Sequence, residues 1–359
     1  MDRMSGDGRF DGDMHSHGID LDSPRIRDHL QTTVCTWLGL PREDQKKAPI
    51  LPKYLRSLLL REEEFTIRHR DQWGCWEHGA SDNYRRGKLW TAEIDEWVAK
   101  ERSALAQDGR QLCPVWPSER DFAFVMTHDV DLLGTRESSA QMLRRARQSF
   151  VELCHQGGLA PARRIARWLY GAARAAPFES KDLEDTLGYC MNVETDFQIN
   201  ASYFFTLYPI SGFAPFDCVY RPSDRYWFDG KSMLVADIMK CLSDKGFDVG
   251  LHGSYHSALE DGLLADQRAR LEQISGRPVI TTRQHWLHYD VAVTPEIQEK
   301  AGDGFNIEKV KRSESLFVAK IPSVIFEPGD RIYIKDSLEN LQHYQELLDL
   351  SLLIFSNFL

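Results

Sequence analysis

The stretch Phe122-Ala-Phe-Val-Met-Thr-His-Asp-Val-Asp131 decides the fold that we expect for this chain. Its first half is a continuous apolar run of strand length, which is typical of a strand covered on both faces in a parallel sheet. Its second half carries Asp129 and Asp131, which lie two positions apart and therefore project to the same side of an extended backbone. In α/β folds the catalytic groups gather at the C-terminal ends of such strands. The stretch thus predicts a parallel α/β sheet with an acidic site at this strand's end.

A second polar group follows another apolar run, in Phe247-Asp-Val-Gly-Leu-His-Gly-Ser-Tyr-His256. Two neighbouring carboxylates repel each other unless a cation or a shared proton lies beside them. One carboxylate with two imidazoles, and coordination positions left for water, is the ligand set of a catalytic zinc site. We therefore expect Asp131, His252 and His256 to bind a divalent metal, with zinc as the expected ion. The alternative is that the carboxylates cap a strand and that the histidines have no common role.

Three motifs occur in one order along the chain: Thr127-His-Asp-Val-Asp131, His252-Gly-Ser-Tyr-His256 and Arg283-Gln-His285. Together they resemble the first three motifs of the polysaccharide deacetylase family, the family 4 carbohydrate esterases. The first motif, preceded by Trp116-Pro117, is similar to that of a bacterial branch with an extra N-terminal region. The similarity covers roughly residues 114–290 and rests on motif order and strand context together, because any one motif alone is weak. It implies a distorted (β/α) barrel that removes acetyl groups with the help of a metal.

The resemblance also implies roles for the remaining polar groups. Asp129 would be the general base that takes a proton as water attacks an acetyl carbonyl, and Arg283 would pair with it and keep it ionised. Tyr255 and Trp286 would line a sugar subsite, since aromatic rings stack on sugar faces. Packing in the wall of the barrel explains these two rings equally well. His128 points to the opposite side of its strand, and we expect it to be a satisfied core histidine.

The general acid of the family pattern is missing at its expected place. Gly304-Phe305 is followed by Asn306 where family members have arginine, and His343 lies in a helical pattern instead of at a strand end. Either His343 or His285 fills the catalytic acid role, or the role is absent. The apolar segment 348–359 further indicates that the barrel is incomplete at its C-terminus.

The chain divides into three expected parts. Residues 1–23 are polar and predict a disordered tail, residues 24–113 a small mixed accessory region, and residues 114–359 the deacetylase-like barrel. Within the barrel we expect strands at 200–207, 247–251 and 279–282, a loop at 222–229, and helices at 233–245 and 259–274.

The segment 138–174 is predicted to be long, helical and basic. Its arginines either meet an anionic glycan or sugar phosphate, or form a solvated face with internal ion pairs. The second interpretation is the default for a charged helix face.

Composition is ordinary for a globular protein: 359 residues, 42% hydrophobic and 27% charged. The net charge of −10 argues against a nucleic acid or an anionic membrane as partner, because both require a positive surface. No stretch is apolar enough for a membrane span, and the N-terminus lacks the apolar core of a signal peptide. The seven cysteines are scattered singly, which is typical of reduced thiols. We therefore expect a cytoplasmic protein.

These features predict a hydrolase of carbon–nitrogen bonds other than peptide bonds. It would remove an acetyl group, N-acetyl rather than O-acetyl, from a sugar of a cell-surface polysaccharide or its precursor. Two other functions stay open: a binding or assembly module that keeps the barrel, favoured by the missing acid, and a metal-dependent hydrolase of cyclic amides, which uses a similar site. The sequence predicts neither the glycan nor the oligomeric state.

Overall fold

The computed structural model describes residues 23–302, except for 68, 72–73, 115–125, 134–136, 176–184 and 211–212. The expected tail up to residue 22, the apolar half of the opening stretch, and the end of the expected barrel with His343 lie outside the described residues. The longer helices are α1 (Pro24–Leu38), α2 (Lys53–Leu60), α5 (Glu93–Gln107), α6 (Ser139–Gln156), α7 (Leu159–Ala175), α8 (Thr186–Asp196), α9 (Val235–Asp244), α10 (Leu263–Ser275) and α11 (Thr294–Ala301). None of the helices in the described ranges has the length and apolar character that a bilayer crossing requires.

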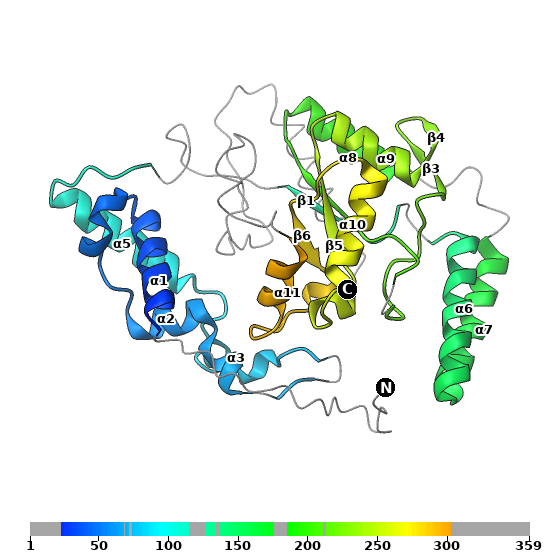
Figure 1. The fold of residues 1–359 in the computed structure, drawn as a ribbon, viewed down its shortest axis with the longest axis horizontal. Helices are drawn as coiled ribbons and strands as arrows, with labels where there is room; N and C mark the ends of the chain where they lie inside the picture. The colour runs from blue at the N-terminus through cyan, green and yellow to red at the C-terminus, as the bar shows by residue number, and fades with distance from the viewer. Residues whose placement is uncertain are drawn as a thin grey trace. The chain divides into compact units, whose positions relative to one another are not determined.

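Four parallel strands form the central sheet (Figure 1). They are β1 (Thr127–Val130), β2 (Ser202–Phe205), β5 (Asp248–Gly253) and β6 (Thr282–Gln284), in the order β1-β2-β5-β6. The prediction of a parallel α/β sheet is confirmed. The strand expected at 279–282 begins only at Thr282, so that Arg283 lies within the strand and not after it.

The sheet is curled into a half-barrel. Neighbouring strands lie about 4.8 Å apart, so β1 and β6 would be about 14 Å apart in a flat sheet. Yet Nη1 of Arg283 on β6 donates to Oδ1 of Asp129 on β1 at 3.0 Å, and its Nη2 donates to Oγ1 of Thr127 at 2.9 Å. An arginine reaches that far only if the two outer strands bend toward each other. This curl is compatible with the distorted barrel expected from the sequence.

The two faces of the sheet have different surroundings. Tyr203 and Phe205 on β2, with Val249 and Leu251 on β5, face a core that α8, α9 and α10 cover. Phe204 and its register partner Gly250 face the concave side. A Cβ at Gly250 would lie 2.4 Å from Oγ1 of Thr281 and 2.7 Å from the Phe204 ring. Glycine is needed there because the Phe204 ring fills the floor of the concave face.

The prediction of a loop at 222–229 is wrong for residues 225–228. Strands β3 (Arg225–Phe228) and β4 (Lys231–Leu234) form an antiparallel hairpin instead. The turn residues Asp229 and Gly230 both have positive φ, 50° and 72°. An Asp-Gly pair between two short strands is a strong hairpin signal, because such a turn matches the strand twist. The following helix therefore starts at Val235 and not at residue 233.

The basic segment is helical, as predicted, and forms two helices. Helices α6 and α7 lie side by side as an antiparallel hairpin (Figure 1). Gly157 and Gly158 separate them with φ values of 70° and 94°, a backbone conformation that only glycine adopts without strain. Ser138 and Gln141 form a capping box that begins α6.

The region 24–113 is helical and has an apolar core of its own. Val34 and Leu38 on α1 and Leu55 on α2 are buried together, and Trp97 on α5 packs against them. A polar contact joins the region to the rest of the chain, since Nη2 of Arg70 donates to Oδ2 of Asp290 at 2.9 Å. All seven cysteines lie in the described ranges, and none of them forms a disulfide.

Candidate functional site

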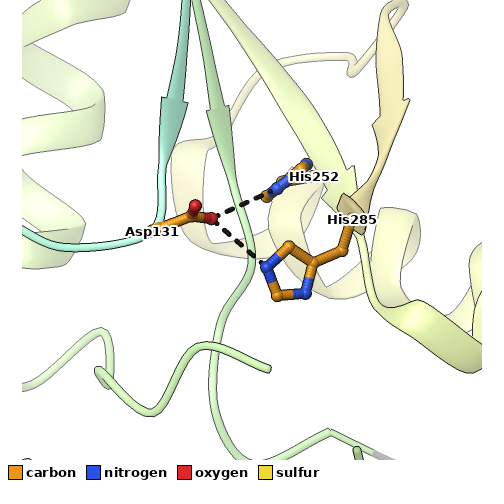
Figure 2. A group of neighbouring side chains, drawn as sticks. All are labelled: Asp131, His252 and His285. Atoms are coloured by element: carbon orange, nitrogen blue, oxygen red, sulfur yellow. Dashed lines mark ion pairs between the residues drawn. The ribbon is translucent and has the colours of Figure 1, made fainter. Parts of the chain in front are cut away.

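A carboxylate and two imidazoles converge at the C-terminal end of the sheet (Figure 2). Asp131 follows β1, His252 lies in β5, and His285 follows β6. Oδ1 of Asp131 lies 3.3 Å from Nε2 of His252 and 3.5 Å from Nε2 of His285. Both histidines are buried, whereas 43% of the Asp131 side chain is exposed. The group could hold a metal ion that stays open to solvent on one side.

The outer nitrogens of both rings have hydrogen-bond acceptors. Nδ1 of His252 lies 2.9 Å from the carbonyl oxygen of Arg283, and Nδ1 of His285 lies 2.8 Å from Oδ1 of Asp217. In a neutral ring the proton therefore belongs on Nδ1, which leaves the lone pair of Nε2 facing the Asp131 carboxylate. Ligating histidines in metalloproteins have this same outer partner. One carboxylate oxygen and two such imidazoles fit a divalent metal of the zinc type.

The third member of this group is His285, whereas the sequence predicted His256. Nδ1 of His256 lies 4.0 Å from Oε1 of Glu260, and its side chain is 33% exposed. A spacing of four residues brings two side chains together on a helix, but His252 lies on a strand and the chain then turns into a short 3-10 helix, Tyr255–Ala258. The structure therefore brings Asp131 and His252 together as expected, and leaves His256 outside the group.

The expected Asp129–Arg283 pair is present on the concave face. Besides its bonds to Asp129 and Thr127, the Arg283 guanidinium lies over the Phe204 ring, with Cζ 4.8 Å from the ring centroid. The side chain of Asp129 is 35% exposed, so that a substrate can reach its carboxylate. Arg283 thus holds the Asp129 carboxylate in one orientation at an accessible place.

Asp217 is a member of the site that sequence reasoning missed. It is fully buried, and its Oδ1 accepts hydrogen bonds from His285 Nδ1 and, at 3.0 Å, from the backbone N–H of Tyr255. Its Oδ2 accepts from the N–H of Ala214 at 2.8 Å. The available signal was a lone carboxylate in the apolar stretch 213–220, because a buried carboxylate requires donors around it.

The charged groups of the site shift one another's pKa values. Burial alone would raise the pKa of Asp131, but its hydrogen bonds to His252 and His285 outweigh burial and lower that pKa below its usual range. Burial alone would lower the pKa of His285, but hydrogen bonds to Asp131 and Asp217 raise it to about 9. In the metal-free protein at neutral pH, His285 is therefore an imidazolium between two carboxylates.

This protonation state predicts a pH-dependent metal affinity. A metal must displace the proton from Nε2 of His285, so loading near neutral pH should release about one proton from this ring. Metal affinity should rise with pH up to about 9 and then level off. Calorimetric titration of metal in buffers with different ionisation enthalpies measures the released protons. A release of zero would contradict the raised pKa.

The metal-free fold should show the opposite pH trend. The pKa of His285 in the folded protein lies above its usual value of 6.5. The imidazolium therefore stabilises the fold fully below pH 6.5, and its contribution to the free energy of unfolding disappears as the pH rises through about 9. Urea unfolding of the metal-free protein at several pH values from 6.5 to about 9 tests whether the free energy of unfolding falls as the pH rises.

Replacing Asp217 by asparagine should weaken metal binding by roughly 10–100-fold, the usual cost of losing an outer partner of a ligating histidine. The amide keeps the size of the side chain but does not orient the Nδ1–H of His285 as a carboxylate does. Asp248→Asn, which changes a half-buried carboxylate bonded to Oγ1 of Thr281, serves as the matched control. Zinc titration against a competing chelator measures both affinities, and equal weakening in both variants would contradict a specific role for Asp217.

The two rings proposed for a sugar subsite have different surroundings. Tyr255 is buried between His288, stacked at 3.9 Å, and Phe216, edge-on at 4.7 Å between ring centroids. This placement does not support Tyr255 as a sugar-stacking surface. Trp286 is 69% exposed, and its ring lies 5.5 Å from that of Phe216.

Trp286 is held in an unusual backbone conformation. Trp286 and Leu287 have φ values of 58° and 52°, in the left-handed region that side chains rarely adopt. Such residues cost about 1–3 kcal/mol each, and they concentrate at functional sites. The turn directs both side chains into solvent, because Leu287 is 74% exposed. Trp286 therefore forms an exposed rim directly after His285.

His128 is satisfied on the opposite side of β1, as predicted. Its Nε2 bonds to Oε1 of the buried Glu194, and the hydroxyl of Tyr203 donates to Oε2 of the same carboxylate at 2.6 Å. Its ring also stacks on Tyr203 at 4.6 Å between centroids. His128 therefore belongs to the packing that supports the sheet.

Comparisons of this chain with protein-family models, with curated proteins and with solved structures found no match.

Proposed function

We propose that the protein is a metal-dependent hydrolase that removes an acetyl group, N-acetyl rather than O-acetyl, from a sugar of a cell-surface polysaccharide or its precursor. The observation that carries this proposal is the convergence of Asp131, His252 and His285 beside the Asp129–Arg283 pair. A three-residue ligand set leaves coordination positions open, which is the arrangement of catalytic metal sites. The order of the three sequence motifs supports the same reaction.

Asp131 Oδ1 and the Nε2 atoms of His252 and His285 would hold the metal, and zinc suits this donor set. A divalent metal bound there would supply Lewis-acid chemistry, polarising an acetyl carbonyl and making water more acidic. Asp217 and the Arg283 carbonyl would keep the two imidazoles in the orientation that presents Nε2.

Asp129 would accept the proton of the attacking water on its free carboxylate oxygen. Oδ1 is held by Nη1 of Arg283, and within the described part of the chain no group donates a hydrogen bond to Oδ2. The guanidinium resists movement because Thr127 and the Phe204 ring bind it from two further sides. A general base at a defined place contributes typically about 10²–10⁴-fold to the rate.

Trp286 would bind the sugar by stacking. Its exposure at the rim, with Phe216 beside it, leaves a ring face available next to the metal ligands. Stacking on this ring would position an acetylated sugar whether or not the sugar carries a charge.

A protein that keeps the site but lacks catalysis is the second candidate. The specific observation in its favour is the position of His285, whose Nδ1 faces Asp217 and whose Nε2 faces Asp131. A metal-bound His285 keeps its one proton on Nδ1, where Asp217 accepts it, so it does not fill the acid role that the sequence left open between His285 and His343. The acid would then come from elsewhere or be absent.

Acetate release decides between the candidates. The zinc-loaded protein is incubated with an N-acetylated oligosaccharide, an O-acetylated one and a cyclic ureide, and the same protein stripped by a chelator serves as control. The proposal predicts acetate from the N-acetylated sugar that depends on metal. Ring opening of the ureide would favour cyclic amide hydrolysis, and metal binding without any product would favour the binding module.

A further inference from the structure

The hairpin of α6 and α7 carries a charge opposite to that of the whole chain. Its only carboxylate between Ser139 and Ala175 is Glu152, in a protein of net charge −10. The arginines are Arg144, Arg145, Arg147, Arg163, Arg164, Arg167 and Arg174. Three of them have carboxylate partners: Arg144 pairs with Asp224, Arg145 with Glu137 and Arg164 with Glu152. The other four have no carboxylate partner among the described residues.

Each helix also exposes an apolar stripe that contains one of these arginines. On α6 the exposed positions 143, 147, 150 and 154 are Leu, Arg, Phe and Cys. On α7 the same spacing, 159, 163, 166 and 170, gives Leu, Arg, Ala and Tyr, all exposed. These spacings place four side chains on one helix face. Leu143 is 50% exposed, Phe150 57%, Leu159 74% and Tyr170 65%.

The stripes lie away from the contact between the two helices. The helices meet through small residues, since Ala146 and Ser149 on α6 and Ala172 on α7 are buried. A Cβ at Gly171 would lie 2.9 Å from Sδ of Met142, so the Met142 side chain of α6 packs directly on Gly171 of α7. The apolar stripes are therefore not the surfaces that hold the hairpin together.

We propose that this hairpin binds the surface of a membrane that contains anionic lipids. Such a surface offers phosphate groups for arginine and hydrocarbon for Leu143, Phe150 and Leu159 at the same place. Arginine reaches head groups while its apolar stem stays beside hydrocarbon, and tyrosine is suited to the same boundary. The proposal does not depend on the hydrolase reaction.

Other occupants fit the hairpin less well. A soluble glycan or sugar phosphate would account for the arginines but would leave the leucines and Phe150 in water. A second copy of this chain would have to bring acidic and apolar groups together, and each outer stripe of the hairpin itself carries arginine and no acid. Charge complementarity and exposed hydrocarbon together therefore favour the lipid surface.

Vesicle sedimentation of the full chain tests the proposal. Phosphatidylcholine vesicles with and without phosphatidylserine are compared at low and high salt. The variant Arg147→Gln/Arg163→Gln/Arg167→Gln should bind the anionic vesicles about a hundredfold less tightly, from the usual contribution of each basic residue near such a surface. The variant Lys231→Gln/Lys240→Gln/Lys245→Gln removes three exposed cations elsewhere and should bind like the unchanged protein.

A second variant separates the apolar contribution. Leu143→Ser/Phe150→Ser should weaken vesicle binding at high salt too, where charge interactions are screened. Thermal melting of every variant checks that the hairpin still folds. Equal binding to neutral and anionic vesicles, or equal loss in the lysine control, would overturn the proposal. A concentration-dependent dimer that Leu143→Ser/Phe150→Ser dissociates would overturn it as well, in favour of a second copy of the chain.

Discussion

Replacing His285 by alanine is expected to abolish tight binding of a divalent metal, whereas replacing His256 is expected to leave it intact. The reason is geometric, because Nε2 of His285 lies 3.5 Å from Oδ1 of Asp131, while His256 lies beside Glu260 and outside the group. The loss should exceed the roughly 10–100-fold that removal of an outer partner costs. Metal content after dialysis against zinc, and the visible spectrum of the cobalt-loaded protein, measure it.

The control for this experiment is a variant that keeps the fold. His285→Ala leaves the buried Asp217 without one of its donors, which by itself destabilises the protein. His285→Gln is therefore tested beside it, since an amide can still donate to Asp217 but is a poor ligand for zinc. If His256→Ala loses its zinc and both His285 variants keep it, the ligand set predicted from the sequence is the right one.

Replacing Asp129 by asparagine is expected to lower acetate release by about 10²–10⁴-fold, the usual contribution of a positioned general base. Metal content should stay unchanged, because Asp129 pairs with Arg283 and is not a member of the metal-binding group. The amide has the same size and can still accept a hydrogen bond from Arg283. The rate constant should therefore fall while KM changes little.

The matched control is Asp131→Asn, which should lose metal and activity together. The comparison distinguishes a general base from a metal ligand. Loss of the base lowers acetate release and leaves the metal content unchanged, whereas loss of a ligand lowers both. Full activity in Asp129→Asn would remove this carboxylate from the mechanism, and loss of zinc from that variant would make it a ligand instead.

The parallel sheet was predictable because its signals are local. Apolar runs of strand length and the alternation of side chains depend only on neighbouring residues, so β2 and β5 lie where the sequence placed them. The strand β1 occupies the polar half of the opening stretch, whose apolar half lies outside the described residues. The hairpin of β3 and β4 was missed although its Asp229-Gly230 turn is a local signal too. There the charged and aromatic residues of β3 gave no apolar run.

The whole-chain charge does not describe the charge of each surface. A net charge of −10 argued against an anionic partner, yet the arginines of α6 and α7 gather on one hairpin with a single carboxylate. The sequence contains this clustering, but an average over the chain conceals it. Whether the arginines meet acids of their own chain depends on pairings such as Arg144–Asp224, across 80 positions.

The amino-acid sequence alone determined which side chains share a strand face, and hence that Asp129 and Asp131 stand together at the end of an α/β sheet. The tertiary structure decided that His285, and not His256, completes the group, and it added Asp217 behind it. The difference has one physical cause. Strand alternation is a property of adjacent residues, whereas convergence of residues from β1, β5 and β6 depends on how far the sheet curls and where the chain turns after each strand.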